Sequence, residues 1–328
     1  MFKVLCKKIN SCYLLMLILS FMGMLPSVAV AEGVSAPEQI LVGVYVNSIH
    51  GINLKEDKFV ADFYIWFKYK NDSLNPLKSF ELKNGKIDSV TNFETHKEDG
   101  GLNHASARVV ATVHELWDVS KYPFDKHELV LEIEDSDNAE NKLVYTADLE
   151  NSGVSDKAQT RGWKIDSVRT KILSNSYNTS YGDSEALEKN KSKYSNFSLS
   201  VDISRVGYTQ FFKLFAVLFF SVFVAFLSFF IYANSAPRFT LGASALVATA
   251  ANSFVVNSAL PESSSFTLSD TFLISSLFFI FLSLATSTIS MRVIRKGNEQ
   301  LAQKIDRVGA MLFLSLFMSC FFWVVCQF

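Results

Sequence analysis

Aromatic residues on the polar face of a strand are the first residues of this sequence whose type and spacing suit ligand binding. Residues 59–69 alternate between apolar and polar positions, which predicts a half-buried strand. Tyr64 and Trp66 fall on its polar face, next to Asp62 and Lys68. Large aromatic side chains that point away from a core suggest a ligand wall or an interface between subunits. Packing against neighbouring strands of the same sheet would explain them equally well.

A second set of aromatic residues lies in a loop that could approach an acidic segment. The connection of residues 174–194 is long and polar and carries Tyr177 and Tyr181, so it is a candidate lid. Residues 132–140 are rich in acids, among them Glu134 and Asp135. Aromatic faces and carboxylates together bind an ammonium group through cation–π and ionic contacts. We therefore expect a small amine or an amino-acid-like ligand, although a divalent cation site or a merely solvated hairpin would also fit the acidic segment.

A third set of residues could line a path for water and ions. Residues 239–260 contain no charge and are long enough to cross a bilayer core of about 30 Å as a helix, yet they are rich in Gly, Ala, Ser and Thr. Such a helix prefers close helical neighbours or water on one side. One stripe of it is polar at both ends and apolar in the middle, the pattern of a pore wall that can lose its water. The stripe consists of Thr240, Ser244, Val247, Ala251, Phe254 and Ser258.

The same stretch also suits a helix that is buried in a bundle. Thr249, Asn252 and Ser253 lie on the side opposite the stripe, so periodicity alone does not select the stripe as the polar face. The choice between a pore wall and a buried helix therefore depends on the rest of the chain.

Catalytic and metal-binding chemistry finds little support in the sequence. No glycine-rich phosphate loop, nucleophile elbow or zinc-binding helix motif occurs. The net charge of −1 does not suggest a nucleic-acid partner. We therefore expect neither an enzyme nor a bound metal or organic cofactor. The five histidines are scattered and lack metal-ligand spacing: His50, His96, His104, His114 and His127.

The amino terminus has the features of a secretory signal peptide. Lys3, Lys7 and Lys8 precede the apolar residues 13–25, and the sequence Ala29-Val30-Ala31 is the small-residue pattern before a cleavage site. We expect residues 1–31 to be removed, so that the mature chain begins outside the cytoplasm. A retained anchor helix is the weaker alternative because the apolar run is short.

The exported region, residues 32–208, is predicted to be an all-β domain. Alternating strand patterns recur at short intervals, which predicts an immunoglobulin-like sandwich of about ten strands. The region contains no cysteine, so it must be stable by core burial alone. The clearest strands are predicted at residues 59–69, 86–94, 106–116, 127–134, 142–145, 163–173 and 196–204.

Residues 209–328 are predicted to form a transmembrane domain with a four-helix bundle. Basic residues concentrate in the linker of residues 292–307, which the positive-inside rule places in the cytoplasm. We therefore expect a multi-pass protein of the inner (plasma) membrane whose β-domain and carboxyl terminus lie on the periplasmic or extracellular side. The four spans are predicted at residues 214–233, 240–260, 271–291 and 308–328.

The loop of residues 117–125 carries the sharpest motif. Its core, Tyr122-Pro123-Phe124-Asp125, resembles the signature loop of the pentameric ligand-gated ion channels, the Cys-loop receptor superfamily. The cysteines that usually bracket this loop would fall at Glu115 and Leu129 and are missing. The resemblance is therefore to the prokaryotic type, which lacks that disulfide.

Other segments agree with the resemblance in their order along the chain. Residues 62–67 and 80–85 precede the motif, Arg205 ends the last strand, and Pro261 follows the second of four hydrophobic spans. The resemblance covers nearly the whole chain after the signal peptide. It implies a homopentamer or a related heteromer in which the second span of each subunit lines a pore for permeant ions.

The resemblance also implies where ligand binding and gating take place. A ligand would lie between subunits, with Tyr64 and Trp66 on one side and Tyr177, Tyr181, Glu134 and Asp135 on the other. Asp125 and Arg205 occupy family positions that pair where the β-domain meets the membrane domain. The residues expected to couple binding to opening are Tyr122, Pro123, Phe124, Asp125, Arg205 and Pro261.

Two questions stay open at this level. Residues 234–238 hold no acid of the kind that cation-selective relatives place before the second span, and Ala236-Pro237-Arg238 resembles the anion-selective pattern with Pro displaced by one, so we lean towards anions or weak selectivity. The alternative function is a membrane-anchored ligand sensor that does not conduct, and electrical recording of the purified protein would separate the two.

Overall fold

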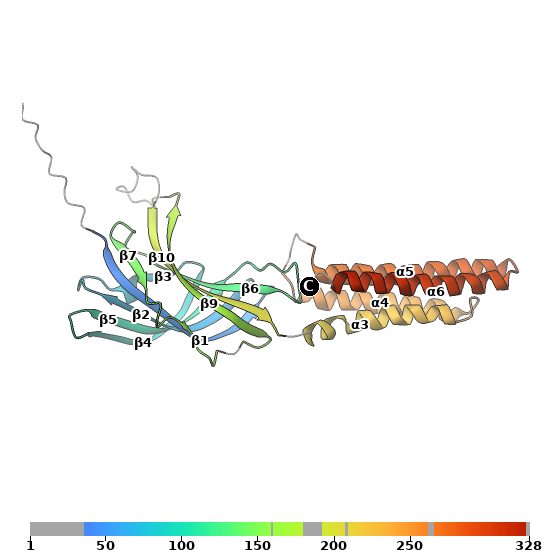
Figure 1. The fold of residues 1–328 in the computed structure, drawn as a ribbon, viewed down its shortest axis with the longest axis horizontal. Coiled ribbons are helices and arrows are strands. Elements are labelled where there is room, and N and C mark those ends of the chain that lie inside the picture. Colours follow the sequence, from blue (N-terminus) through green and yellow to red (C-terminus); the bar gives the residue numbers. More distant parts are fainter. Residues whose placement is uncertain (1–35, 159, 180–191, 207–208, 262–265, 326–328) are drawn as a thin grey trace, which may run out of the picture. The chain divides into compact units, whose positions relative to one another are not determined.

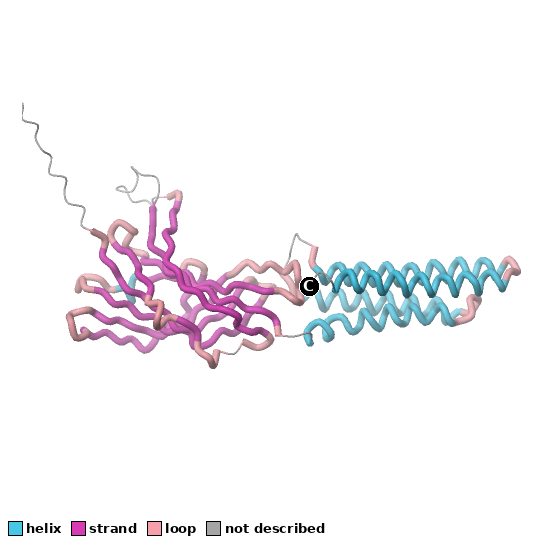
Figure 2. Tube along the Cα trace, viewed as in Figure 1, coloured by secondary structure: helices cyan, strands magenta, loops and turns pink. Residues whose placement is uncertain are grey.

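The computed structural model describes residues 36–158, 160–179, 192–206, 209–261 and 266–325. Strands occupy the chain up to Arg205, and long helices follow from Thr209 (Figures 1 and 2). The elements from Glu38 onward belong to one folded unit. The signal peptide expected at residues 1–31 lies outside the described residues.

The β-region contains ten strands within the described residues. A short helix, α2 (Pro76–Ser79), interrupts them. The strands are β1 (Glu38–Asn53), β2 (Lys58–Tyr69), β3 (Phe80–Leu82), β4 (Gly85–Lys97), β5 (Asn103–His114), β6 (Lys126–Asp135), β7 (Leu143–Ala147), β8 (Gly153–Val154), β9 (Trp163–Tyr177) and β10 (Ser192–Arg205).

Two sheets share one hydrophobic core. The larger sheet has the order β4-β5-β2-β1-β7 with β8 paired to β1, and the smaller has the order β3-β6-β10-β9. Every second residue of β2 and β5 is buried, as the two-residue period of a strand requires. Phe63 and Phe67 from the larger sheet and Phe197 from the smaller sheet belong to the same cluster of buried residues. The predicted β-sandwich is confirmed as two sheets that pack on one core.

The long loop predicted at residues 174–194 is partly wrong. β9 continues to Tyr177 and β10 begins at Ser192, so that Ser192 pairs with Tyr177 and Ser195 with Ser174. The end of β9 and the start of β10 are polar, so the sequence pattern there is that of a loop. The two ends pair with each other in a hairpin that extends beyond the core (Figure 1). Tyr181 lies outside the described residues.

Four long helices follow the sheets, with the 3-10 turn η2 (Ser228–Phe230) after the first. They are α3 (Thr209–Leu227), α4 (Ala236–Ser258), α5 (Leu268–Arg295) and α6 (Glu299–Val325). α4 packs against both α3 and α5, and α6 packs against α5 (Figure 1). Three stretches in the described residues are long and apolar enough to cross a membrane: Thr209–Phe230, Ala236–Ser258 and Leu268–Arg295.

The fourth predicted span and the bounds of the predicted linker both need correction. α6 is not among those three candidate spans, and it begins at Glu299, within the charged residues 292–307 that are predicted to form a linker. The real connection is a tight turn at residues 296–298, where Gly297 has a φ of 85° that favours glycine. Charged residues mark the helix ends here, because two packed helices extend beyond their apolar parts.

Candidate functional site

The helix α4 has one buried and one exposed face, and the exposed face is the stripe predicted from the sequence. Pro237 lies in the first turn, where a helix tolerates proline. Val247 and Phe254 are 70% and 76% exposed in the single chain. The structure exposes the whole stripe: Thr240, Ser244, Val247, Ala251, Phe254 and Ser258.

The opposite face of α4 packs closely inside the bundle. A Cβ at Gly242 would lie 2.3 Å from the side chain of Leu284 on α5, so a larger residue here would require this leucine to move. Thr249 and Asn252 are also buried here, and Thr249 Oγ1 and Asn252 Nδ2 have no hydrogen-bond partner. An unsatisfied buried polar group costs about 1–3 kcal/mol. The buried-helix reading thus holds for this face, though the packing is not optimal.

Arg238, the one charged residue of α4, is fully buried and faces away from the exposed stripe. Its guanidinium forms a bidentate ion pair with Asp306 of α6, at 2.8 Å and 2.5 Å, and its Nε donates to Ser287 of α5 at 2.9 Å. Three helices therefore meet at this cation. The preference for anions or weak selectivity rests on the absence of an acid and on the position of Pro237, and it stays a prediction.

The loop of residues 115–125, here called the junction loop, contains a buried charge cluster. Arg205 at the end of β10 donates from Nε to Asp125 Oδ1 at 2.6 Å, as the resemblance implied. His127 Nε2 lies 2.6 Å from the other carboxylate oxygen. The Arg205 guanidinium also lies over the rings of Trp163 and Tyr122, at 4.2 Å and 4.9 Å from their centres. The sequence reasoning had missed His127 and Trp163.

The protonation of Asp125 follows from this cluster. Burial by itself raises the pKa of Asp125, but the hydrogen bonds from His127 and Arg205 outweigh burial, so the pKa lies below its ordinary value. Asp125 is therefore ionised at neutral pH and holds the two basic side chains at the junction.

The junction loop touches the helices α3 and α5 directly. Leu268 N at the start of α5 donates to Ser120 O at 2.9 Å, and Ser269 Oγ donates to Tyr122 O at 3.1 Å. The rings of Phe124 and Phe211 of α3 lie 5.3 Å apart. Trp117 Nε1 donates to the Asn53 carbonyl at 3.3 Å, which ties the loop to the β1–β2 turn.

These contacts connect the β-region to α3 and α5 through the predicted coupling residues Tyr122 and Phe124. Tyr122 is joined to Pro123 by a cis peptide bond. Pro261 follows α4 and is half-buried. The junction-loop contacts described above reach α3 and α5, not Pro261, so the loop can act on α4 through these two neighbours.

Glu134 is the centre of a second polar cluster, and the solvated-hairpin interpretation is wrong for it. The side chain is on β6, and the residue is 1% exposed. It accepts hydrogen bonds from Asn175 at 2.5 Å, from Tyr177 Oη at 2.9 Å and from Asn196 at 3.0 Å. Burial, and then the hydrogen bond to Glu134, raises the pKa of Tyr177.

A lysine ammonium already lies against this cluster. Lys83 Nζ lies 4.6 Å from the centre of the Tyr177 ring. The sequence analysis names Glu134 and Tyr177 but not Lys83, Asn175 and Asn196, because strand pairing in the smaller sheet decides which side chains meet Glu134. The cluster joins a carboxylate, an aromatic face and a cation.

Asp135, the next acid on β6, is built into a turn. Its two oxygens accept from Ser79 Oγ at 2.6 Å, from Asp137 N at 3.0 Å and from Asn138 N at 2.8 Å. The residue is 2% exposed. The prediction that Asp135 faces a ligand therefore needs correction. Its two carboxylate oxygens accept hydrogen bonds within the turn and stabilise the chain reversal after β6.

Tyr64 and Trp66 on β2 belong to the larger sheet, whereas Glu134 and Tyr177 belong to the smaller one. Trp66 lies across Gly43 of β1, where a Cβ would come within 2.2 Å of the indole, and its Nε1 donates to Asp148 at 3.0 Å. Packing within the sheet thus explains Trp66. Tyr64 is exposed, so it remains free to face another molecule.

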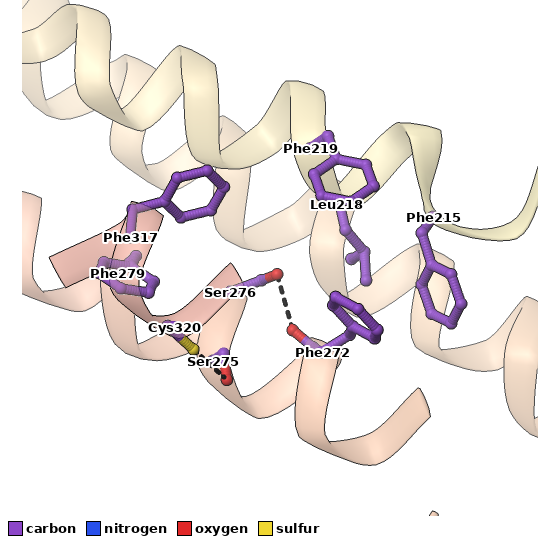
Figure 3. A pocket seen from close by; sticks show the side chains of 9 residues that line it. All are labelled: Phe215, Leu218, Phe219, Phe272, Ser275, Ser276, Phe279, Phe317 and Cys320. Carbon is purple, nitrogen blue, oxygen red and sulfur yellow. Dashed lines mark hydrogen bonds between the residues drawn. The ribbon is translucent and has the colours of Figure 1, made fainter. Parts of the chain in front are cut away.

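A narrow apolar cavity lies between α3, α5 and α6 (Figure 3). Phe215, Phe272 and Phe279 supply much of its wall, and Cys320 Sγ lies 3.6 Å from Ser275 Oγ at one side. No lining residue belongs to α4. The cavity is therefore separate from the exposed stripe of that helix.

The site consists of three parts: the exposed charge-free stripe of α4, the junction loop with its buried charges, and the Glu134 cluster on the smaller sheet. Comparison of the chain with models of known protein families and with curated protein sequences found no match. The function must therefore be inferred from these three parts and from the sequence motifs.

Proposed function

We propose that this chain is one subunit of a ligand-gated ion channel, in which five copies surround a pore lined by α4. The observation that carries the proposal is the agreement between two independent properties of α4. The face that the single chain leaves exposed is also its charge-free stripe, polar at the ends and apolar at Val247 and Phe254. Such a face suits a water path that dries in the closed state.

Oligomerisation is part of the proposal because one helix encloses no lumen. α4 is shielded by α3 and α5 on its other face, so copies of the chain arranged around an axis would expose only the stripe to the centre. Closed rings with cyclic symmetry are the usual way to build such a centre. The proposed membrane domain contains four helices, with α6 completing the outer layer.

The junction loop supports a gating role for the β-region. Motion of β6 or β10 reaches the loop through Asp125 and Arg205, and the loop bonds to the start of α5. Ligand binding shifts the channel towards the open state only if the ligand binds the open arrangement more tightly. The junction loop provides a continuous set of contacts through which tighter ligand binding in the open state can act on the helices.

The test of the pore is cysteine accessibility in a chain whose four native cysteines are replaced. Cysteine at 244, 247 or 251 is expected to react with a charged, water-borne thiol reagent at least about tenfold faster than cysteine at 245 or 256 on the buried face, because reaction requires water and thiolate. Phe220→Cys on the exposed face of α3 is the control for contact with lipid. If cysteines at 247 and 251 react in every state as slowly as the cysteine at 220, the stripe faces lipid.

The same purified protein, recorded in planar bilayers, decides whether it conducts. Ligand-dependent currents are expected from the native chain, together with their block by reagent at residue 247. Reaction at 247 without any current under a broad set of ligands would favour the non-conducting sensor.

We infer that the Glu134 cluster takes a small amine at the interface between two β-regions. Glu134 supplies the charge, and the Tyr177 face already holds the ammonium of Lys83. Exposed Tyr64 of a neighbouring copy is the proposed opposite wall. The protein would then bind the ammonium by the same chemistry with which it holds its own lysine.

Tyr177→Ala is expected to raise the amine concentration for half-maximal response about tenfold, since a desolvated cation–π contact is worth up to about 2 kcal/mol. Tyr177→Phe keeps the aromatic face, so we expect a smaller rise. Phe93→Ala removes an exposed aromatic residue of β4, which is separated from β2 by β5, and is the matched control. Equal responses of Tyr177→Ala and the native chain across an amine panel would exclude this site.

A further inference from the structure

Four residues of metal-binding type gather on one face of the β4–β5 hairpin. The strand register places His96 of β4 directly opposite His104 of β5, and their ring centres are 4.8 Å apart. Asn103 and Ala105, the neighbours of His104, are buried on the inner face of the sheet, so both histidines lie on its outer face. Glu94 and Glu98 flank His96 at a spacing of two residues and share that face.

One imidazole nitrogen of this group lacks a partner. His104 Nδ1 is buried and makes no hydrogen bond, although Glu98 Oε1 lies 3.5 Å away. Glu98 instead binds Lys68 Nζ at 2.8 Å. An imidazole nitrogen without a hydrogen bond can take a metal ion.

We propose that His96, His104 and Glu98 bind a divalent transition-metal ion of the Zn²⁺ class. Two imidazoles and a carboxylate match the ligand preference of zinc and disfavour Ca²⁺ and Mg²⁺, which take oxygen ligands. The site is independent of channel activity and of the Glu134 cluster, which lies on the other sheet.

Binding requires a local rearrangement of side chains. No three ligands among the described residues already stand in metal-binding geometry. Zn–N bonds of about 2.0–2.1 Å require the two ring nitrogens to turn towards a common point. His96 is exposed and must turn on the ring of His104, while Glu98 must leave Lys68. The lysine therefore competes with the metal for the carboxylate.

The test is calorimetric titration of the purified full-length chain, without an affinity tag, with Zn²⁺. Saturable binding is expected, weakened at least about tenfold in His96→Asn and His104→Asn, in the range known for lost metal-site contacts. Because His96 is exposed, His96→Asn is expected to fold normally, and its thermal midpoint without zinc checks this. Lys68→Met frees Glu98 and is expected to tighten binding.

His50→Asn on β1 is the matched control for zinc held by scattered histidines. Loss of binding in His50→Asn, equal zinc affinity in His96→Asn and the native chain, or no saturable binding at all would each overturn the proposal. Unchanged affinity in Lys68→Met would remove Glu98 from the ligand set.

Discussion

Replacing Asp306 by alanine is expected to destabilise the helical region by about 3–5 kcal/mol, because it leaves the Arg238 guanidinium buried without its counter-charge. Arg238 is fully buried, and only Ser287 and the Ile231 carbonyl would remain as partners. In a chain of this size we expect the thermal midpoint in detergent to fall by on the order of 10 °C.

Two further variants make this prediction sharp. Glu299→Ala removes an exposed acid from the first turn of the same helix, and it should change stability by less than about 0.5 kcal/mol. Arg238→Met combined with Asp306→Leu removes both charges and should recover most of the loss, since apolar replacements of buried pairs are often neutral. A midpoint for Asp306→Ala equal to that of Glu299→Ala would show that the ion pair is unimportant.

Replacing Arg205 by alanine is expected to have a comparable effect at the junction. It leaves Asp125, which is 1% exposed, with His127 as its remaining basic partner, and removes the cation stacked on Trp163 and Tyr122. Breaking a buried pair in this way costs about 3–5 kcal/mol. We expect Arg205→Ala to assemble poorly or to fail to open, as judged by size-exclusion chromatography and bilayer recording.

The pH dependence of the thermal midpoint is a second test of the Asp125–Arg205 pair. The pKa of Asp125 is depressed in the folded chain, so its contribution to stability is complete above the unfolded pKa of about 3.9 and is lost as the pH falls through the folded value. Without Arg205, burial raises the pKa of Asp125 and only His127 remains to lower it. The thermal midpoint of Arg205→Ala should therefore begin to fall at a higher pH than that of the native chain.

Arg169→Ala is the matched control for Arg205→Ala. Arg169 also pairs with acids, Glu128 and Asp202, but it is half exposed, and such surface pairs are worth about 0–1 kcal/mol. We expect this variant to gate and to unfold almost as the native chain does. If Arg205→Ala behaves like Arg169→Ala, the junction does not depend on the Asp125–Arg205 pair.

Local sequence patterns were sufficient to place most of the elements. Alternation between apolar and polar residues located β2, β5 and much of β10, because each strand has one face on the core. Long uncharged runs located three helices that can cross a membrane. The predicted element boundaries were wrong where a strand or helix includes polar residues: β9 and β10 extend into polar residues, and α6 begins in charged sequence.

The sequence by itself determined the chemical character of each part of this protein: a cysteine-free β-region, a helix α4 without charge after Arg238, and a Tyr-Pro-Phe-Asp loop between strands. Only the tertiary structure decided which face of α4 is exposed, because small residues give this helix little apolar asymmetry. It also decided that Arg238 meets Asp306, that Glu134 is enclosed by Asn175, Tyr177 and Asn196, and that His96 faces His104. These pairings depend on strand register and helix packing, which bring together residues that no sequence spacing connects.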